Sequence, residues 1–276
     1  MPAEKIHFEN QEGQTLSARL EKPVHQHPHT YALFAHCFTC GKQLTAIRRI
    51  AQGLTLNGFA VLSFDFTGLG ESEGDFADTN FSSNIEDLVS AANFLKATHE
   101  APTLLVGHSL GGSAVIRAAS LLPSVTAIAT IGAPASPSHV QHLFLSQTKE
   151  IEASGVAKVE IAGRPLTVKK QFLEDIRTQA LQPTLESLEQ ALLILHSPQD
   201  LVVSVDNATK IYQAARHPKS YISLDGADHL LTNKADAQYA GQMIAAWAMR
   251  YLDIDKSKGP HPEKDVAVRL RPEDQV

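Results

Sequence analysis

Ser109 stands between Gly107 and Gly111 in the stretch Gly-His-Ser-Leu-Gly, the spacing of a serine nucleophile on a tight turn. An aliphatic run, 103–107, precedes the serine, and a helix-forming run starts by Ser113. This order of strand, turn and helix would lift the serine hydroxyl to a helix N-terminus, where the helix dipole favours developing negative charge. Glycine is needed on both sides because a Cβ would clash with the neighbouring strand and helix. The stretch predicts a nucleophile elbow.

A serine hydroxyl is a poor nucleophile at neutral pH and needs a base within hydrogen-bond reach. Asp200 follows the predicted strand 191–196, and His229 follows the predicted strand 220–224. Functional residues gather where parallel strands end, so both side chains are expected at the same edge of the sheet as Ser109. In that arrangement the histidine would take the serine proton, while the aspartate would hold the imidazole in the right tautomer and stabilise its cation.

Three other carboxylates are rivals for the acid role: Asp206, Asp225 and Asp228. Asp225 and Asp228 lie too near His229 in the sequence to be its usual partner. Asp206 is expected in or beside a helix. The sequence therefore favours Asp200.

The developing oxyanion needs two preorganised N–H donors. One predicted donor is the backbone N–H of Leu110, directly after the serine. The other is expected in His-Cys-Phe-Thr-Cys-Gly, which follows the strand 31–35. We favour the N–H of Phe38 there, with Cys37 as the alternative.

Strands and helices alternate along most of the chain. Two alternating segments, 4–9 and 15–20, are predicted as exposed-edge strands joined by a turn at Glu12-Gly13. Apolar runs then predict strands at 31–35, 59–65, 103–107, 125–131, 191–196 and 220–224, and periodic segments predict helices at 44–57, 84–99, 113–120, 204–215 and 235–252. Short apolar strands alternating with helices predict an α/β fold whose mostly parallel sheet is covered on both faces.

The alternation is interrupted over 135–190, which contains two amphipathic segments and a hairpin-like stretch, 159–168. An insertion between two core strands is best explained as a cap over the site. Six of its apolar residues are expected to roof a modest hydrophobic pocket: Leu143, Phe144, Leu145, Phe172, Leu173 and Ile176. We therefore predict one domain over 1–252 with this cap inserted, followed by a charged, linker-like tail, 253–276.

The composition is that of an ordinary globular protein, with 276 residues, 43% of them hydrophobic, and a net charge of −6. The acidic balance argues against nucleic-acid or anionic-membrane partners. No apolar stretch reaches the ~18 residues of a membrane span, and no leader pattern is visible. Two cysteines cannot form a disulfide framework. We expect a cytoplasmic protein with a small-molecule substrate and no cofactor or metal, and predict no oligomeric state.

Five motifs in this order resemble the α/β-hydrolase superfamily over roughly 5–252. They are His36-Cys-Phe-Thr-Cys, Asp65-Phe-Thr-Gly-Leu-Gly-Glu-Ser, Gly107-His-Ser-Leu-Gly-Gly, Ser197-Pro-Gln-Asp and Ala227-Asp-His. The chain is most similar to the hydrolase module of bacterial α/β hydrolase–OsmC fusion proteins, which share His-Cys-Phe-Thr-Cys. That resemblance implies that 253–276 corresponds to the linker leading toward an OsmC-like domain. Cys37 departs from the common pattern, in which glycine often follows the histidine.

The leading interpretation is a serine carboxylesterase that cleaves short- to medium-chain acyl esters through an acyl-enzyme. The alternative is a catalytically idle hydrolase fold that serves as a ligand-binding or interaction module, which a fluorophosphonate should not label. A third hypothesis is a thiol-redox site at Cys37 and Cys40, whose C-x-x-C spacing follows a strand. Substituting both cysteines by serine with esterase activity retained would exclude it.

Overall fold

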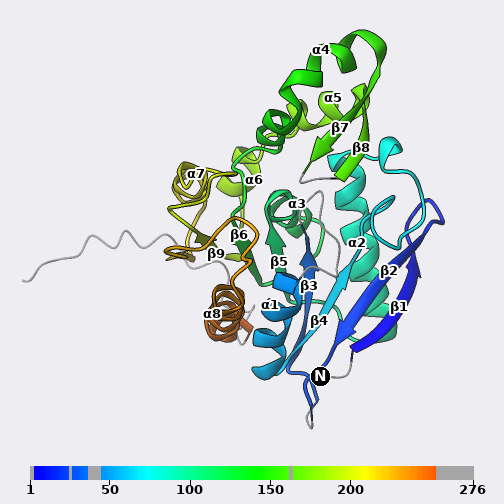
Figure 1. The fold of residues 1–276 in the computed structure, drawn as a ribbon. Coiled ribbons are helices and arrows are strands. Elements are labelled where there is room, and N and C mark those ends of the chain that lie inside the picture. Colours follow the sequence, from blue (N-terminus) through cyan, green and yellow to red (C-terminus); the bar gives the residue numbers. More distant parts are fainter. Residues whose placement is uncertain (1–2, 25–26, 37–44, 162–163, 253–276) are drawn as a thin grey trace, which may run out of the picture.

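The computed structural model describes residues 3–24, 27–36, 45–161 and 164–252, and an eight-stranded sheet lies at its centre (Figure 1). The strand order is β1-β2-β4-β3-β5-β6-β9-β10. The pairs β1–β2 and β2–β4 are antiparallel, and every later pair is parallel. The strands are β1 (Ala3–Glu9), β2 (Thr15–Glu21), β3 (Thr30–Ala35), β4 (Phe59–Phe64), β5 (Leu104–His108), β6 (Ala127–Ile131), β9 (Ala191–His196) and β10 (Lys219–Ser223).

Helices cover both faces of this sheet. One face carries α1 (Thr45–Leu56) and α8 (Lys234–Leu252), and the other carries α2 (Phe81–Thr98), α3 (Leu110–Ala119) and α7 (Asp206–Ala214) (Figure 1). Strand side chains alternate between two cores, so β3 sends Leu33 to one face and Phe34 to the other. Every residue of β3, β5, β6 and β9 is buried. The predicted α/β fold with a mostly parallel, doubly covered sheet is confirmed.

Two predicted elements differ from the structure. The prediction of two exposed-edge strands is wrong for the second of them, because β2 pairs with β4 as well as β1 and buries most of its residues. The second helix begins at Phe81 rather than at Asn84. A capping box explains the earlier start: the Asn80 side chain accepts from the Ser83 N–H, and the Ser83 hydroxyl accepts from the Asn80 N–H.

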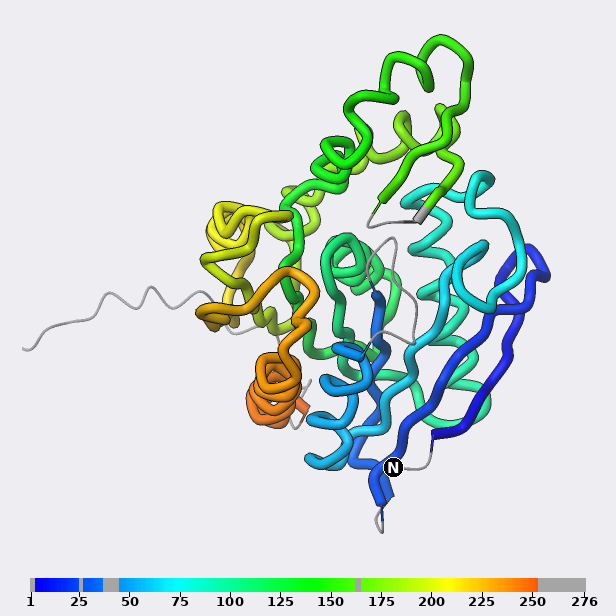
Figure 2. Tube along the Cα trace, in the orientation of Figure 1, coloured from blue at the N-terminus to red at the C-terminus, as the bar shows by residue number. Residues whose placement is uncertain are grey.

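The inserted segment between β6 and β9 forms a layer of its own above the ends of the central strands (Figure 2). It contains a 3₁₀ helix, η2 (Pro137–Phe144), then α4 (Leu145–Ser154), the antiparallel pair β7 (Val156–Ile161) and β8 (Arg164–Lys169), α5 (Lys170–Thr178) and α6 (Gln182–Glu186). We call residues 137–186 the cap segment. The predicted hairpin is present and longer than expected.

The apolar residues of the cap segment pack against one another instead of roofing a pocket. Phe144, Phe172, Leu173 and Ile176 are each at most 1% exposed and belong to the same core as α2 and α3. Leu145, in contrast, is 62% exposed. The expectation that they line a hydrophobic pocket is therefore wrong for Phe144, Phe172, Leu173 and Ile176, because their surface is used to hold the cap segment together. For Leu143, which is partly buried, and for Leu145 it stays a prediction.

A polar latch joins the cap segment to α2. The Asp175 carboxylate on α5 accepts hydrogen bonds from the Ser82 backbone N–H at 2.8 Å and from the Ser82 hydroxyl at 2.7 Å. Gln179 also donates to the Ser82 hydroxyl at 3.0 Å. A carboxylate at the first turn of a helix satisfies N–H groups that have no partner inside the helix and interacts favourably with the helix dipole.

The tail 253–276 lies outside the described residues. None of the described helices has the length and apolar character needed to cross a membrane.

Removing the latch should loosen the cap segment. Asp175→Ala deletes three charge-assisted hydrogen bonds, two from Ser82 and one from Gln179, and we expect unfolding to become easier by about 1–3 kcal/mol. Amide exchange should accelerate in residues 170–178 and in the first turn of α2, measured by hydrogen–deuterium exchange mass spectrometry.

Glu174→Ala is the matched control on the same helix, because within the described residues Glu174 makes an exposed ion pair with Lys170 at 3.3 Å and no contact with α2. Equal exchange rates in the two variants would show that the latch contributes nothing.

Candidate active site

Ser109 occupies the tight turn between β5 and α3. Its φ is 55° and its ψ is −128°, a backbone conformation that residues with a side chain rarely adopt. Its N–H donates to the Ile131 carbonyl at 2.9 Å, and its carbonyl accepts from the Gly112 N–H at 2.8 Å. The strained turn is thus held by hydrogen bonds on both sides, and the partly exposed hydroxyl stands at the N-terminus of α3.

The glycines around Ser109 leave no room for side chains. A Cβ on Gly107 would lie 2.3 Å from the Gly111 carbonyl oxygen, and one on Gly111 would lie 2.4 Å from the Ala35 carbonyl oxygen. Real Cβ atoms do not approach this closely. The sequence predicted this requirement, and the close contact of β5, α3 and β3 is its physical cause.

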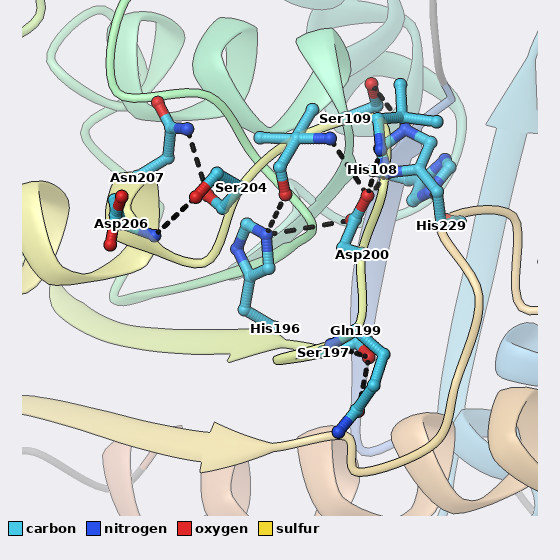
Figure 3. Close-up of polar contacts among 12 residues, drawn as sticks. His108, Ser109, His196, Ser197, Gln199, Asp200, Ser204, Asp206, Asn207 and His229 are labelled. Carbon is cyan, nitrogen blue, oxygen red and sulfur yellow. Dashed lines mark hydrogen bonds and ion pairs between the residues drawn. The ribbon is translucent and has the colours of Figure 1, made fainter.

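The three residues predicted as a triad lie in one hydrogen-bonded row (Figure 3). His229 Nε2 is 3.1 Å from the Ser109 hydroxyl oxygen, and His229 Nδ1 is 2.7 Å from Asp200 Oδ2. They come from loops after β5, β9 and β10, whose carboxyl ends meet at one edge of the sheet. The spacing allows a proton to pass from serine to histidine, and the carboxylate fixes the orientation of the ring.

Asp200 is held tightly at the end of β9. Its Oδ1 accepts from the Val202 N–H at 2.8 Å and from the Val203 N–H at 2.9 Å, which leaves Oδ2 for His229. Burial alone would raise the pKa of the Asp200 carboxyl, but the hydrogen bonds from His229 and the two backbone N–H groups outweigh it. The pKa of Asp200 is therefore lowered, and the residue is an anion at neutral pH.

The rival carboxylates have other partners. Asp225 accepts a hydrogen bond from the Ser223 hydroxyl at 2.7 Å, and Asp228 accepts from the Thr232 N–H at 3.0 Å. Asp206 is exposed in the first turn of α7, as expected. None of the three has a recorded contact with His229.

Two neighbours that the sequence did not single out shape the space around the row. Gly132 has a φ of 56°, and a Cβ there would lie 3.3 Å from both Asp200 Oδ2 and His229 Nδ1. Gln199 Oε1 accepts from the Gly226 N–H at 2.8 Å and so connects the turn before Asp200 to the loop before His229. The one signal in the sequence that could have pointed to Gly132 is its position directly after the predicted strand 125–131.

Two buried histidines also flank the row, and their roles could not be deduced from the sequence. His108 Nε2 is 2.7 Å from the His229 carbonyl oxygen, and His196 Nε2 is 2.8 Å from the Val203 carbonyl oxygen (Figure 3). Carbonyl oxygens only accept, so both histidines carry hydrogen on Nε2. Burial lowers the pKa of His196, and burial together with the nearby His229 lowers the pKa of His108 to about 3. Both rings are neutral at neutral pH.

The predicted oxyanion donors are only partly described. Leu110 is the first residue of α3, so its N–H has no partner inside the helix and lies directly after Ser109. Phe38 and Cys37, together with Cys40, lie outside the described residues. His36, which precedes them, is buried against Phe66 and lies 3.7 Å from Asp65 Oδ1.

Gly68 and Gly70 form a tight loop after β4, with φ values of 72° and 57°. Asp65 Oδ2 accepts from the Glu71 N–H within it at 3.1 Å. Over the described part of the chain, no three His, Cys, Asp or Glu side chains form a group suited to a metal ion.

Comparisons with known proteins identify the superfamily of the chain. The family model described as "Serine aminopeptidase, S33" matches residues 27–159. The crystal structure of the esterase domain from a Rhodothermus marinus protein is 49% identical, with a TM-score of 0.76, and the alignment covers 91% of this chain and 100% of that domain. The chain therefore belongs to the α/β-hydrolase superfamily and is a hydrolase of the α/β type by family.

Curated relatives are more distant. The palmitoyl-protein thioesterase ABHD10 of Rattus norvegicus is 26% identical over 71% of this chain and 66% of its own length. An uncharacterized protein of Salmonella typhimurium, YfhR, is 26% identical over 60% of this chain and 53% of its own length. The chain thus spans between half and two thirds of the length of these relatives.

The buried histidines should make the protein sensitive to acid. Between pH 6.5, the ordinary histidine pKa, and about 3, the unfolded chain binds a proton at residue 108 that the folded protein does not. Protonation then favours unfolding, so His108 should lower the free energy of unfolding by about 1.4 kcal/mol for each unit that the pH falls below about 6.5. Urea denaturation at pH 7.5, 6.0 and 5.0 measures this slope.

His108→Gln removes the titrating group and should give a shallower slope, while Glu174→Ala should keep the wild-type slope. A His108→Gln protein with the full wild-type slope would contradict this explanation.

Proposed function

We propose that this protein is a serine carboxylesterase that cleaves short- to medium-chain acyl esters through an acyl-enzyme. The observation that carries the proposal is the row Ser109 Oγ, His229, Asp200, with distances of 3.1 and 2.7 Å. The strained conformation of Ser109 supports it, because such strain concentrates at functional positions. Its relative from Rhodothermus marinus, named an esterase domain, agrees with this class.

In the first half of the reaction, the Ser109 hydroxyl oxygen attacks the ester carbonyl carbon while His229 Nε2 takes the hydroxyl proton. The carbonyl oxygen becomes an anion that the Leu110 N–H stabilises, together with a second donor that we assign to Phe38 from the sequence. When the tetrahedral intermediate collapses, the bond to the alcohol oxygen breaks and His229 returns its proton to that oxygen. The alcohol leaves, and the acyl group remains on Ser109.

In the second half, a water molecule replaces the alcohol. His229 accepts a proton from water, the resulting hydroxide oxygen attacks the acyl carbon, and the same N–H donors stabilise the second oxyanion. Collapse releases the carboxylic acid and returns the proton to Ser109. Asp200 keeps the Nδ1 hydrogen of His229 in place and stabilises the imidazolium that forms in each half.

The packing of the cap segment supports the proposed preference for short acyl groups. Its large apolar side chains, among them Phe144 and Phe172, are fully buried in the core that they share with α2 and α3. They cannot also line a long apolar channel, as a palmitoyl chain would need. This favours short acyl groups, although a curated relative is named a palmitoyl-protein thioesterase.

The alternative is a hydrolase fold that binds a ligand without cleaving it. It predicts an unreactive Ser109, whereas the carboxylesterase predicts a serine that reacts covalently. Substitutions of Ser109, His229 and Asp200 distinguish the two hypotheses.

Ser109→Ala and His229→Ala should each lower kcat by about 10⁴-fold or more with little effect on folding, because each removes a group that takes part in proton transfer. Asp200→Asn should also be severe, since the amide cannot stabilise the imidazolium. The hydrolysis of p-nitrophenyl butyrate and the melting temperature of each variant provide the measurement.

Asp206→Asn is the matched control, because Asp206 is an exposed carboxylate in the first turn of α7 and should be dispensable. Near-normal activity of Asp200→Asn, or more than a few per cent residual activity in Ser109→Ala, would rule out the proposed triad.

A panel of p-nitrophenyl esters from acetyl to palmitoyl, with palmitoyl and butyryl thioesters beside them, should give the highest kcat/KM between acetyl and roughly hexanoyl. The physical reason is that the large apolar side chains of the cap segment are buried in their own core and do not line an acyl channel. A maximum on a palmitoyl ester or thioester would contradict the size preference while leaving the triad intact.

A further inference from the structure

His108 separates Gly107 from the proposed nucleophile, and its side chain points away from the turn into the interior. The residue is 4% exposed and ends β5. Its Nε2 lies 2.7 Å from the carbonyl oxygen of His229, which is 121 positions further along the chain. Because that oxygen can only accept, the His108 Nε2–H is the donor.

The same ring also contacts the imidazole of His229. The two ring centroids are 5.0 Å apart with an interplanar angle of 41° (Figure 3). His108 therefore holds His229 at two places, by a hydrogen bond to its backbone and by ring contact with its side chain. The strand that carries the nucleophile thus also sets the position of the base.

The loop that carries His229 needs such an anchor. It runs between β10 and α8, and Asp225, Gly226 and Asp228 in it are exposed. Leu231, two residues after the base, has a φ of 51°. Ser109 and Leu231 are the only non-glycine residues with positive φ among those described, so strained backbone flanks the proposed reaction on both sides.

The charge state of His108 suits the role of an anchor. Burial and the neighbouring His229 lower the pKa of His108 to about 3, although Asp200 acts in the opposite direction. The ring is therefore a neutral donor at neutral pH. A second cationic imidazole beside His229 would oppose formation of the imidazolium, and a neutral one does not.

We propose that His108 is a positioning residue: its Nε2–H···O=C hydrogen bond holds the imidazole of His229 at the distance from Ser109 that proton transfer requires. The inference rests on the proposed function, because it assigns His108 a task in the same reaction. His108 does not touch the substrate. Its contribution should appear in kcat rather than in KM, since misplacement of a reacting group by about 1 Å can cost on the order of 100-fold in rate.

His108→Met and His108→Gln form a matched pair, since both side chains are unbranched and of similar size and only glutamine can donate a hydrogen bond. We expect His108→Met to lower kcat for p-nitrophenyl butyrate by at least about tenfold. KM should change less than about threefold, since substrate binding is not altered. His108→Gln should keep kcat within about threefold of wild type because its amide can reach the His229 carbonyl.

Equal kcat values for the two variants would overturn the inference, whether both are high or both are low, because the hydrogen bond would then not be the cause. A wild-type protein that hydrolyses no ester would refute the proposed function instead. If the wild type is active, Ser109→Ala inactive and the pair equal, only the positioning role is refuted.

Long-range ¹H–¹⁵N spectra of the wild-type histidines provide a test that does not depend on how a variant folds. The His108 resonances, assigned by their absence in His108→Gln, should show one neutral tautomer with hydrogen on Nε2 from pH 8 to pH 5. A protonated ring or the opposite tautomer in that range would overturn the inference.

Discussion

The turn at Ser109 is the constraint on which the rest of the site depends. Strand β5 must stop and helix α3 must start within one residue, and the backbone can do this only with a positive φ at the serine. The turn also needs contact distances around Gly107 and Gly111 that exclude any side chain. The consequences are three: a partly exposed serine, a Leu110 N–H beside it that has no partner inside α3, and a buried His108 directed at the opposite loop.

The order of the strands in the sheet brings the other site residues to the turn at Ser109. Parallel strands β5, β6 and β9 are neighbours, and β10 follows β9 at the edge, so the loops after them open on the same side. Gly132, after β6, lies against both Asp200 and His229 without a Cβ that would push them apart. The cap segment enters between β6 and β9 and is joined to α2 through Asp175. The segments that follow the parallel strands are therefore held in place by contacts with one another and with the helices.

Features whose signal is local or follows strand order could be predicted from the sequence. The elbow was predictable because Gly107 and Gly111 must be glycine, and the row was predictable because Asp200 and His229 follow successive strands. Features that depend on long-range packing could not be predicted from the sequence. The burial of β2 depends on its pairing with β4, and the burial of Phe172 depends on how the cap segment folds on itself. The role of His108 depends on two residues 121 positions apart coming within 2.7 Å, for which no pattern in the sequence exists.

Covalent labelling tests the central claim most directly. The wild-type protein treated with a fluorophosphonate should gain the mass of one adduct, and peptide mapping should place it on Ser109, with labelling greatly slowed in His229→Ala. An unlabelled protein, or an adduct on any other residue, would contradict the account, because the hydrogen-bonded row would then not activate its serine.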